Sequence, residues 1–364
     1  MPIKDSPLLV TRIFPNPVSI RRRILGWYDR NGRALPWRLA PGETADPYRV
    51  WLSEIMLAQT TVATVRGYYD AFLDRWPTLE NLAAANLDDV LHAWQGLGYY
   101  ARARNLHQCA RLVAGDMKGC FPDTEEGLRR LPGIGAYTAA AIAAVVFGRK
   151  TMPIDTNIER VIARLYAIDE PFPQGRKRIV ALAPGLASKT RPGDMAQAMM
   201  DLGARVCMTR SADCGVCPLS KECLAVQAKD AVRYPVKAPK KKRPVRHGMV
   251  FWVQRGNGRV LLRQRPERGL LGGMMEIPST DWREQVWSFE EAQTQAPVKA
   301  AWTPLDGIVR HTFTHFHLEL TVLAAETIDK GPKGALWCPL SEFSQYALPT
   351  VMKKIARHVS NVTG

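Results

Sequence analysis

Four of the seven cysteines in this 364-residue chain lie within seventeen residues, and this cluster constrains the fold more than any other feature. They are Cys207, Cys214, Cys217 and Cys223, separated by six, two and five residues. Thiolates at this spacing can converge on one metal centre, and soft sulfur ligands select zinc or an iron–sulfur cluster. The uneven spacing favours a 4Fe–4S cluster over zinc, because paired Cys-x-x-Cys zinc sites are more symmetric. A loop without metal is the third possibility that the sequence leaves open.

The charge balance favours a polyanionic partner. The chain has 50 Lys and Arg against 34 Asp and Glu, a formal net charge of +16, and such an excess attracts nucleic acid. The longest apolar run, residues 139–147, has nine residues, whereas a membrane span needs about 20. The first residues lack the apolar segment and cleavage site of a secretory signal. We therefore expect a cytoplasmic protein, in a bacterium.

The apolar pattern divides the chain into two domains. After an N-terminal extension over residues 1–19, apolar residues recur every three or four positions through residues 20–232, which predicts a mainly helical domain. Residues 233–246 predict a linker, because seven of the fourteen are basic and three are proline. Residues 247–364 predict a smaller α+β domain. Its expected elements are strands over 249–254, 259–265 and 309–323 and a closing helix over 351–359.

A short turn with two glycines predicts a phosphate-binding hairpin in the helical domain. Residues 131–135, Leu-Pro-Gly-Ile-Gly, separate two helical stretches expected over 125–130 and 137–147. Gly133 and Gly135 allow a tight turn and bring backbone amides close to an anion at the start of the second helix. The pattern is typical of a helix-hairpin-helix, which grips a DNA phosphate without reading its sequence.

Two acidic residues are candidates for catalysis. Glu54 stands in a mostly apolar helical stretch, where desolvation would raise its pKa and suit it to act as a general acid. The alternative is a glutamate that faces solvent. Asp155 precedes the amphipathic helix expected over 158–167 and is either a functional carboxylate or simply the N-cap of that helix.

Residues 96–105 combine glycines, aromatic residues and arginines. This mixture suits a loop whose rings stack or wedge against bases while its arginines contact phosphates. The alternative is that the tyrosines pack inside the protein.

These features together resemble the endonuclease III superfamily of DNA glycosylases, which shares the hairpin, an Asp about twenty residues later and the 6-2-5 cysteine spacing. Within that superfamily, residues 20–231 resemble the adenine DNA glycosylases, the MutY family. The matching strings are Leu35-Pro-Trp-Arg38 and residues 51–56, 96–105 and 197–203. In the second domain, residues 270–273 and 310–315 resemble the family's Nudix-like domain, which recognises 8-oxoguanine.

The resemblance implies a monomeric enzyme of base excision repair at the nucleoid, with a 4Fe–4S cluster on the four cysteines. It would flip adenine out of double-stranded DNA, where the adenine is paired with 8-oxoguanine or guanine, and leave an abasic site. Glu54 matches the acid that protonates adenine at N7, and Asp155, with Asn157 beside it, matches the carboxylate that stabilises the cationic sugar. Tyr137 stands where bifunctional relatives carry a Schiff-base lysine, which implies excision without strand cleavage.

The same match assigns residues to the DNA interface. The adenine pocket would include Arg33, Trp37 and Arg38. Gln59 and Thr60 would lie against 8-oxoguanine, and Leu97 and Tyr99 would wedge the duplex. The loop over the lesion base would be Phe313, Thr314 and His315. Further DNA-binding positions are Gly133, Gly135 and Gln197.

The chain departs from the family pattern at several positions. Thr156 stands where the family has glycine, Ala58 replaces a second glutamine, and Thr314 replaces a serine but keeps the hydroxyl. The second domain lacks the Arg-Glu-x-x-Glu-Glu cluster that binds Mg²⁺ in Nudix hydrolases, so we expect it to recognise and not to hydrolyse. We also expect His311, His315 and His317 to share one face of a strand with Phe313, without binding zinc. The competing functions are a lyase for oxidised pyrimidines and a DNA-binding protein without catalysis.

Overall fold

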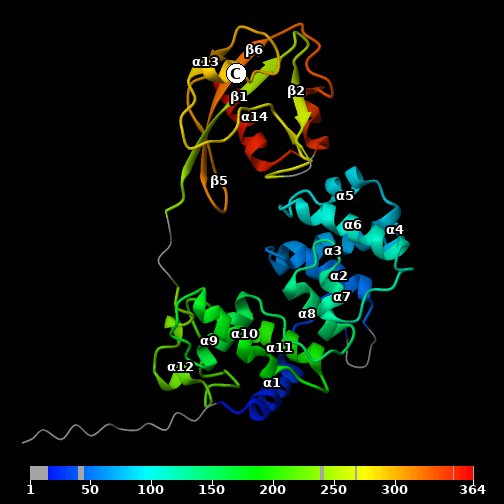
Figure 1. The fold of residues 1–364 in the computed structure, drawn as a ribbon, viewed down its shortest axis with the longest axis vertical. Helices are drawn as coiled ribbons and strands as arrows, with labels where there is room; N and C mark the ends of the chain where they lie inside the picture. The colour runs from blue at the N-terminus through cyan, green and yellow to red at the C-terminus, as the bar shows by residue number, and fades with distance from the viewer. Residues whose placement is uncertain (1–14, 40–44, 238–241, 267–268, 347, 364) are drawn as a thin grey trace, which may run out of the picture. The chain divides into compact units, whose positions relative to one another are not determined.

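The computed structural model divides into two compact units (Figure 1). The first unit comprises the residues up to Ala85 together with Asn105–Pro239, and the second comprises Asn86–Arg104 together with Lys240–Gly364. A short part of the expected helical domain thus clusters with the C-terminal residues. The described residues are 15–39, 45–237, 242–266, 269–346 and 348–363. Most of the expected N-terminal extension, and residues 238–241 of the expected linker, lie outside them.

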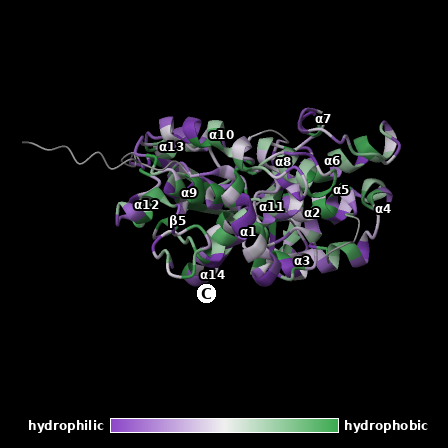
Figure 2. Ribbon diagram, turned by 90° about the horizontal axis from the view of Figure 1, so that it is seen from below, coloured by the Kyte–Doolittle hydropathy of each residue, from purple (hydrophilic) through white to green (hydrophobic). Residues whose placement is uncertain are grey.

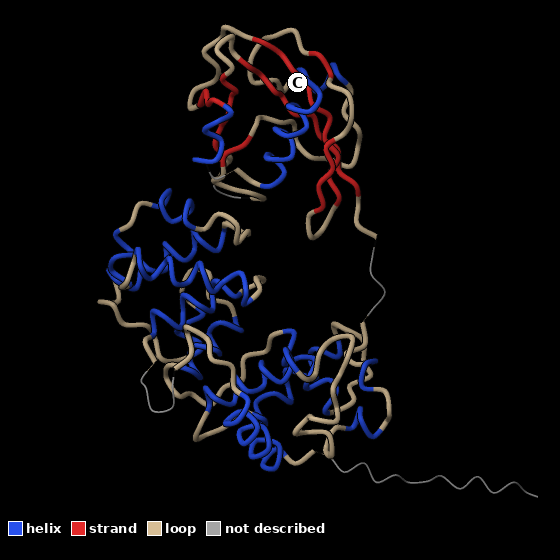
Figure 3. Tube along the Cα trace, turned by 180° about the vertical axis from the view of Figure 1, so that it is seen from behind, coloured by secondary structure: helices blue, strands red, loops and turns tan. Residues whose placement is uncertain are grey.

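Helices and loops make up the first unit, as predicted; apart from one isolated bridge, no strand occurs in its described residues (Figure 3). Most of its helices carry both hydrophilic and hydrophobic residues (Figure 2). None of the described helices is long and apolar enough to cross a membrane. The helices are α1 (Pro17–Asn31), α2 (Pro47–Leu57), α3 (Val62–Arg75), α4 (Leu79–Ala84), α6 (Ala101–Gly115, which begins in the second unit), α7 (Glu125–Arg129), α8 (Ala136–Val145), α9 (Thr156–Leu165), α10 (Gln174–Leu186), α11 (Pro192–Arg205) and α12 (Leu224–Gln227), followed by the 3-10 turn η1 (Ala231–Arg233).

The glycine turn between α7 and α8 forms the expected hairpin. Gly133 has a φ of +76°, and a Cβ atom there would lie 2.7 Å from Cβ of Asn105, so only glycine fits. Gly135 is the N-cap of α8 and offers no side chain to its first N–H groups. These amides remain available to an anion at the helix N-terminus.

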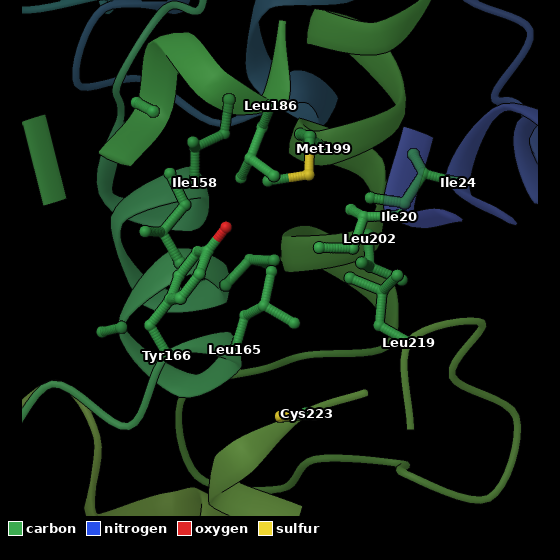
Figure 4. Packing of buried hydrophobic residues seen from close by; sticks show 14 of the residues in the cluster. Ile20, Ile24, Ile158, Leu165, Tyr166, Leu186, Met199, Leu202, Leu219 and Cys223 are labelled. Carbon is green, nitrogen blue, oxygen red and sulfur yellow. The ribbon is translucent and has the colours of Figure 1, made fainter. Parts of the chain in front are cut away.

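A hydrophobic core of the first unit packs α9 against α1, α10 and α11 (Figure 4). The apolar stripe of α9 supplies Ile158, Ile162 and Leu165, all less than 2% exposed. Their neighbours in this cluster include Ile20, Ile24, Leu186, Met199 and Leu202. Because α9 begins immediately after Asp155, this packing also fixes the position of that carboxylate.

A mixed seven-stranded sheet organises the second unit, with the order β3-β2-β1-β6-β4 and with β5 beside β6 and β7 beside β2. β1 and β6 run parallel over ten residue pairs, and the other paired strands are antiparallel. Alternate residues of β1 enter two separate cores, Val250 and Trp252 one of them, Phe251 and Val253 the other. The elements are α5 (Leu87–Ala93), β1 (Val245–Gln254), β2 (Arg259–Gln264), β3 (Met275–Glu276), α13 (Phe289–Gln293), β4 (Thr303–Pro304), β5 (Val309–Thr312), β6 (His317–Glu326), β7 (Leu336–Pro339), the 3-10 turn η2 (Leu340–Gln345) and α14 (Thr350–Thr363).

The single strand expected over residues 309–323 is wrong, because the chain reverses inside it. β5 and β6 form a hairpin in which Thr312 pairs with His317 and His311 pairs with Leu318. An alternating pattern continues unchanged across such a reversal, and the turn contains neither glycine nor proline, so the sequence gives no signal. His311 and His317 consequently lie on opposite faces, and the common face expected for the three histidines does not exist.

The linker expected from residue 233 also begins too early. Tyr234 is 6% exposed and packs against the core of the first unit. Its carbonyl accepts a hydrogen bond of 3.1 Å from Nε of the buried Arg164, and the carbonyl of Val236 accepts one of 3.2 Å from the amide of Phe172. Basic and proline-rich composition concealed these two anchors.

Replacing Gly203 tests the close packing of α11 on the start of α9. A Cβ atom at this position would lie 2.6 Å from Cβ of Asn157 and 2.9 Å from its carbonyl oxygen. We expect Gly203→Ala to lower the free energy of unfolding by about 1–3 kcal/mol, since the added methyl must displace backbone. The matched control is Gly185→Ala on α10, where no atom lies within 4 Å and alanine should stabilise the helix by about 0.5–1 kcal/mol. Equal effects in chemical unfolding would contradict the packing described here.

Candidate active site

A small cavity of about 50 Å³ in the first unit brings together most of the residues expected at an active site. It lies beside a larger basic cavity of about 850 Å³, and the two share five lining residues, Arg33, Leu35, Arg38, Val145 and Gln197. The expected residues that line the small cavity are Arg33, Trp37, Arg38, Glu54, Tyr137 and Gln197.

Glu54 is buried on α2 and only 7% exposed, which excludes the solvent-facing alternative. Its Oε2 atom is buried and has no hydrogen-bond partner among the described residues. Burial raises the pKa of this carboxyl to about 7; Tyr137 and Arg38 partly offset the rise, and the negative charge of Asp155 adds to it. At neutral pH the group therefore holds its proton about half of the time, as a general acid requires.

Tyr137, on α8, is close enough to both acidic residues for their charges to act on its hydroxyl. Burial raises the pKa of its hydroxyl well above the usual value, and the negative charges of Glu54 and Asp155 raise it further. The hydroxyl thus stays protonated and donates to Sδ of Met200 at 3.1 Å. It supplies a neutral polar group where an amine would be needed for a Schiff base.

Asp155 is the N-cap of α9, as one of the two interpretations of the sequence expected. Its Oδ1 accepts the amide hydrogen of Ile158 at 2.7 Å, and its Oδ2 accepts from Nδ2 of Asn157 at 2.7 Å. Each oxygen keeps a further lone pair, so capping the helix and stabilising a nearby cation are compatible.

Arg160 connects this carboxylate to the cysteine loop. It donates to Oδ1 of Asn157 at 2.9 Å, to the carbonyl of Gly203 at 2.6 Å and to the carbonyl of Cys207 at 2.6 Å. Asn157, whose Nδ2 contacts Asp155, is thereby held from its other end. A continuous chain of hydrogen bonds runs from Asp155 to the first of the four cysteines.

Asp201 is a residue of this site that the sequence alone did not single out. Its side chain is fully buried and accepts from Nε of Arg33 at 2.7 Å and from both terminal nitrogens of Arg38 at 2.7 Å. Burial tends to raise the pKa of Asp201, but the hydrogen bonds and charges of the two arginines outweigh it, and the pKa is lowered. The available signal was spacing, because Asp201 follows Gln197 by four residues on α11 and shares its face.

The four cysteines line one small cavity, and none of them is in a disulfide. The buried Arg164 donates to Sγ of Cys207 at 3.2 Å and to the carbonyl of Met208 at 2.8 Å. Among the described residues, no three His, Cys, Asp or Glu side chains are placed to share a single metal ion. An iron–sulfur cluster takes its thiolates on different iron atoms, so the donor set fits a cluster without converging on one point.

The remaining expected DNA contacts are not among the residues that line this cavity. Gln59, with a φ of +64°, is exposed after α2, next to Thr60. In the second unit, Tyr99 is 54% exposed, and its hydroxyl lies 3.3 Å from Oγ1 of Thr314. Leu97 is only 4% exposed, so its side chain packs inside the protein. A side chain that wedges a duplex would have to be exposed.

Comparison with known proteins agrees with this geometry. Residues 52–183 match the family model described as the HhH-GPD superfamily of base excision DNA repair proteins, and residues 249–358 match the NUDIX domain. The solved structure of a thermostable thymine-DNA glycosylase is similar to 58% of this chain and 97% of its own, with 28% identity and a TM-score of 0.52. The fold and these matches define a DNA glycosylase of the helix-hairpin-helix superfamily that carries a Nudix-like domain.

Whole-chain relatives narrow this class. The chain is 36% identical to the adenine DNA glycosylase of Homo sapiens, over 93% of this chain and 73% of that protein. It is 28% identical to the adenine DNA glycosylase of Buchnera aphidicola subsp. Schizaphis graminum, over 91% of this chain and 96% of that protein. The chain belongs to the adenine DNA glycosylase family, which confirms the resemblance drawn from its motifs.

The raised pKa of Glu54 predicts a pH-dependent cost in stability. In the unfolded chain this carboxyl titrates near its ordinary value of 4.5, and in the folded protein near 7. A carboxyl whose pKa is higher in the folded protein contributes to the free energy of unfolding. That contribution is complete below the pKa of the unfolded chain and is lost as the pH rises through the pKa of the folded protein. We expect the stability of Glu54→Gln relative to the native protein to grow by about 2 kcal/mol from about pH 5 to about pH 8. A difference that stays constant with pH, measured by chemical unfolding, would contradict the burial of an ionisable group here.

Proposed function

We propose that this protein is a monofunctional glycosylase that hydrolyses the N-glycosidic bond of adenine paired with 8-oxoguanine or guanine in double-stranded DNA. The observation that carries the proposal is the presence of a buried acid, Glu54, and a helix-capping carboxylate, Asp155, whose charges both act on Tyr137. Cleavage of a glycosidic bond needs these two functions, a proton donor for the leaving group and a negative charge near the sugar.

In the proposed reaction, adenine flips out of the duplex into the cavity beside Glu54. Glu54 donates its proton to N7 as the bond from N9 to C1′ breaks, and the bonding electrons leave with the base. Asp155 stabilises the positive charge on the sugar, while Asn157 and Arg160 hold the carboxylate in place. A water molecule then adds to C1′ and loses a proton, which leaves an abasic site.

Tyr137 supports hydrolysis without strand cleavage. A lyase forms a Schiff base through an amine at the reacting carbon, and this position carries a phenol whose raised pKa keeps it neutral. The proposed enzyme therefore leaves the phosphodiester backbone intact.

We assign Gln59 and Thr60, and separately Tyr99 and the Phe313–His315 turn, to contacts with the base opposite adenine. The Nudix-like domain then acts in recognition alone. In support, Glu276, the acid that follows the glycine pair at 272–273, is 2% exposed and paired with Arg263 and Arg265, so it is not available to bind Mg²⁺.

We also propose that Cys207, Cys214, Cys217 and Cys223 hold a 4Fe–4S cluster. Bound there, the cluster would cross-link the loop and, through Cys207 and Arg160, support the position of Asn157. The net charge of +16 and the open N-terminus of α8 would supply phosphate contacts. On this proposal the protein acts as a monomer on DNA, in the compartment that holds the chromosome.

A single-turnover assay on a duplex with one adenine opposite 8-oxoguanine tests the function. We expect strand breaks only after alkali, and we expect Asp155→Asn and Glu54→Gln each to slow excision by at least about a hundredfold, the usual contribution of such groups. Glu126→Gln, on the exposed surface of α7, is the control and should retain activity. Breaks without alkali would indicate a lyase, and unchanged rates in both acid variants would exclude the mechanism.

A further inference from the structure

The ring of Trp282 fills a space between the sheet and the turn that connects β5 to β6. A Cβ atom at Gly248, on β1, would lie 2.8 Å from Cδ1 of Trp282 and 3.0 Å from Leu320, so glycine leaves room for the indole. Beside this ring lies Phe313, the first residue of the turn, with ring centroids 5.6 Å apart and planes inclined by 31°. Trp282 thus joins the sheet to the turn.

The backbone around Trp282 is fixed to β1 on both sides. The amide of His247 donates to the carbonyl of Arg283 at 2.7 Å, and the amide of Arg283 returns a bond of 3.1 Å. The amide of Thr280 donates to the carbonyl of Met249 at 2.9 Å. The indole Nε1 also donates to Oγ of Ser279 at 3.3 Å. Because these bonds bracket Trp282, its ring has a defined place before any contact with the turn is made.

A buried ion pair supports the same ring. The guanidinium of Arg265 lies 5.3 Å from the centroid of Trp282. Arg265 is paired with the buried Glu276, which also accepts from Nε of Arg263 at 2.7 Å. Since Glu276 is only 2% exposed, removing its charge would leave two arginines without their partner. Arg265 is consequently held where it can contact the aromatic face.

The turn itself depends on side-chain packing. The amide of Phe313 donates to the carbonyl of Phe316 at 2.9 Å, which joins the first and last residues of the turn. The ring of Phe313 contacts Phe316 at 4.9 Å and His311 at 4.6 Å between centroids. Thr314 and His315 are exposed at the tip. The orientation of the two exposed residues therefore follows from how Phe313 is seated.

We propose that Trp282 is a positioning residue for base recognition, holding Phe313 and thereby fixing the Phe313–His315 turn in the shape that contacts the base opposite adenine. This inference rests on the proposed function, because it assigns the turn to that base. Trp282 acts through Phe313 and does not itself contact DNA in this account.

Trp282→Leu tests the inference, and Trp287→Leu is the control. Trp287 is buried, whereas Trp282 is partly buried. Nε1 of Trp287 donates to the carbonyl of Asp281 at 2.9 Å, and Trp287, like Trp282, has an arginine over its ring, Arg283 at 3.6 Å. It belongs to the other core of the sheet and not to the core beside Phe313. Both variants lose an indole that packs in a core of the second unit, and the indole of Trp287 is the more buried, so a general loss of stability affects both.

Two readouts separate positioning from mere stability. The first is the ratio of single-turnover excision rates opposite 8-oxoguanine and opposite guanine, and the second is amide hydrogen exchange across residues 312–317 in the protein without DNA. We expect Trp282→Leu to lower the rate ratio by about three- to tenfold, the effect of one aromatic contact, and to speed exchange in the turn. Trp282→Phe keeps an aromatic ring and should therefore keep most of the native rate ratio and most of the native protection from exchange. Trp287→Leu should change neither the rate ratio nor the exchange in the turn.

Unchanged exchange in the turn of Trp282→Leu would overturn the proposal, and so would equal effects of Trp282→Leu and Trp287→Leu. A native protein that excises adenine equally fast opposite both bases would overturn the proposed recognition function instead. In that case faster exchange in Trp282→Leu would still establish that Trp282 positions the turn, while its role in recognition would be excluded.

Discussion

The ion pairs that Asp201 makes with Arg33 and Arg38 are the interaction on which the candidate active site depends. A fully buried carboxylate is costly unless its partners compensate it, and here two guanidinium groups bind both of its oxygens. The pairing also neutralises Arg38, which lies close enough to lower the pKa of Glu54. Without Asp201, the positive charge of Arg38 would favour the ionised form of Glu54 more strongly. Asp201 thus helps Glu54 to keep its proton near neutral pH.

Helix α9 connects this chemistry to the cysteine loop. Its N-terminus carries Asp155 as a cap, its side contributes Arg160, and its last turn contributes Arg164. The two arginines bind carbonyl groups around Cys207, so the loop and the carboxylate of Asp155 are supported by the same helix. A cluster bound by the cysteines would stiffen that support without touching the substrate. Helix α9 also supplies much of the hydrophobic core. Packing of that core therefore fixes the positions of both the cysteine loop and Asp155.

Local patterns predicted much of this structure. The burial of Glu54 followed from its apolar neighbours, the N-cap position of Asp155 from the amphipathic helix after it, and the hairpin from its two glycines. Each of these depends on residues close together in the chain, where periodicity and turn chemistry are decisive. The resemblance to a known family then added roles that no local pattern contains.

The features that the sequence did not reveal depend on contacts between distant segments. Asp201 is part of the site because its carboxylate accepts hydrogen bonds from Arg33 and Arg38, which lie more than 160 positions away in the chain. Tyr234 holds its segment against the first unit because its carbonyl accepts a hydrogen bond from the buried Arg164. Leu97 is buried although its neighbours in the sequence are glycines and tyrosines. The reversal between β5 and β6 preserved the alternation of the strands and so left no trace in the pattern. The place of Trp282 depends on the space above Gly248, which exists only in the folded protein.

The most direct test of the account is the pH dependence of single-turnover adenine excision, since the central claim is that burial keeps Glu54 protonated as the general acid. The account predicts that the rate is constant at low pH and falls about tenfold for each pH unit above about 7, following the pKa of Glu54. DNA binding measured over the same range should not follow that curve. A rate that stays flat to about pH 9, or that begins to fall only near the ordinary pKa of a tyrosine at about 10, would contradict the assignment of Glu54 as the acid.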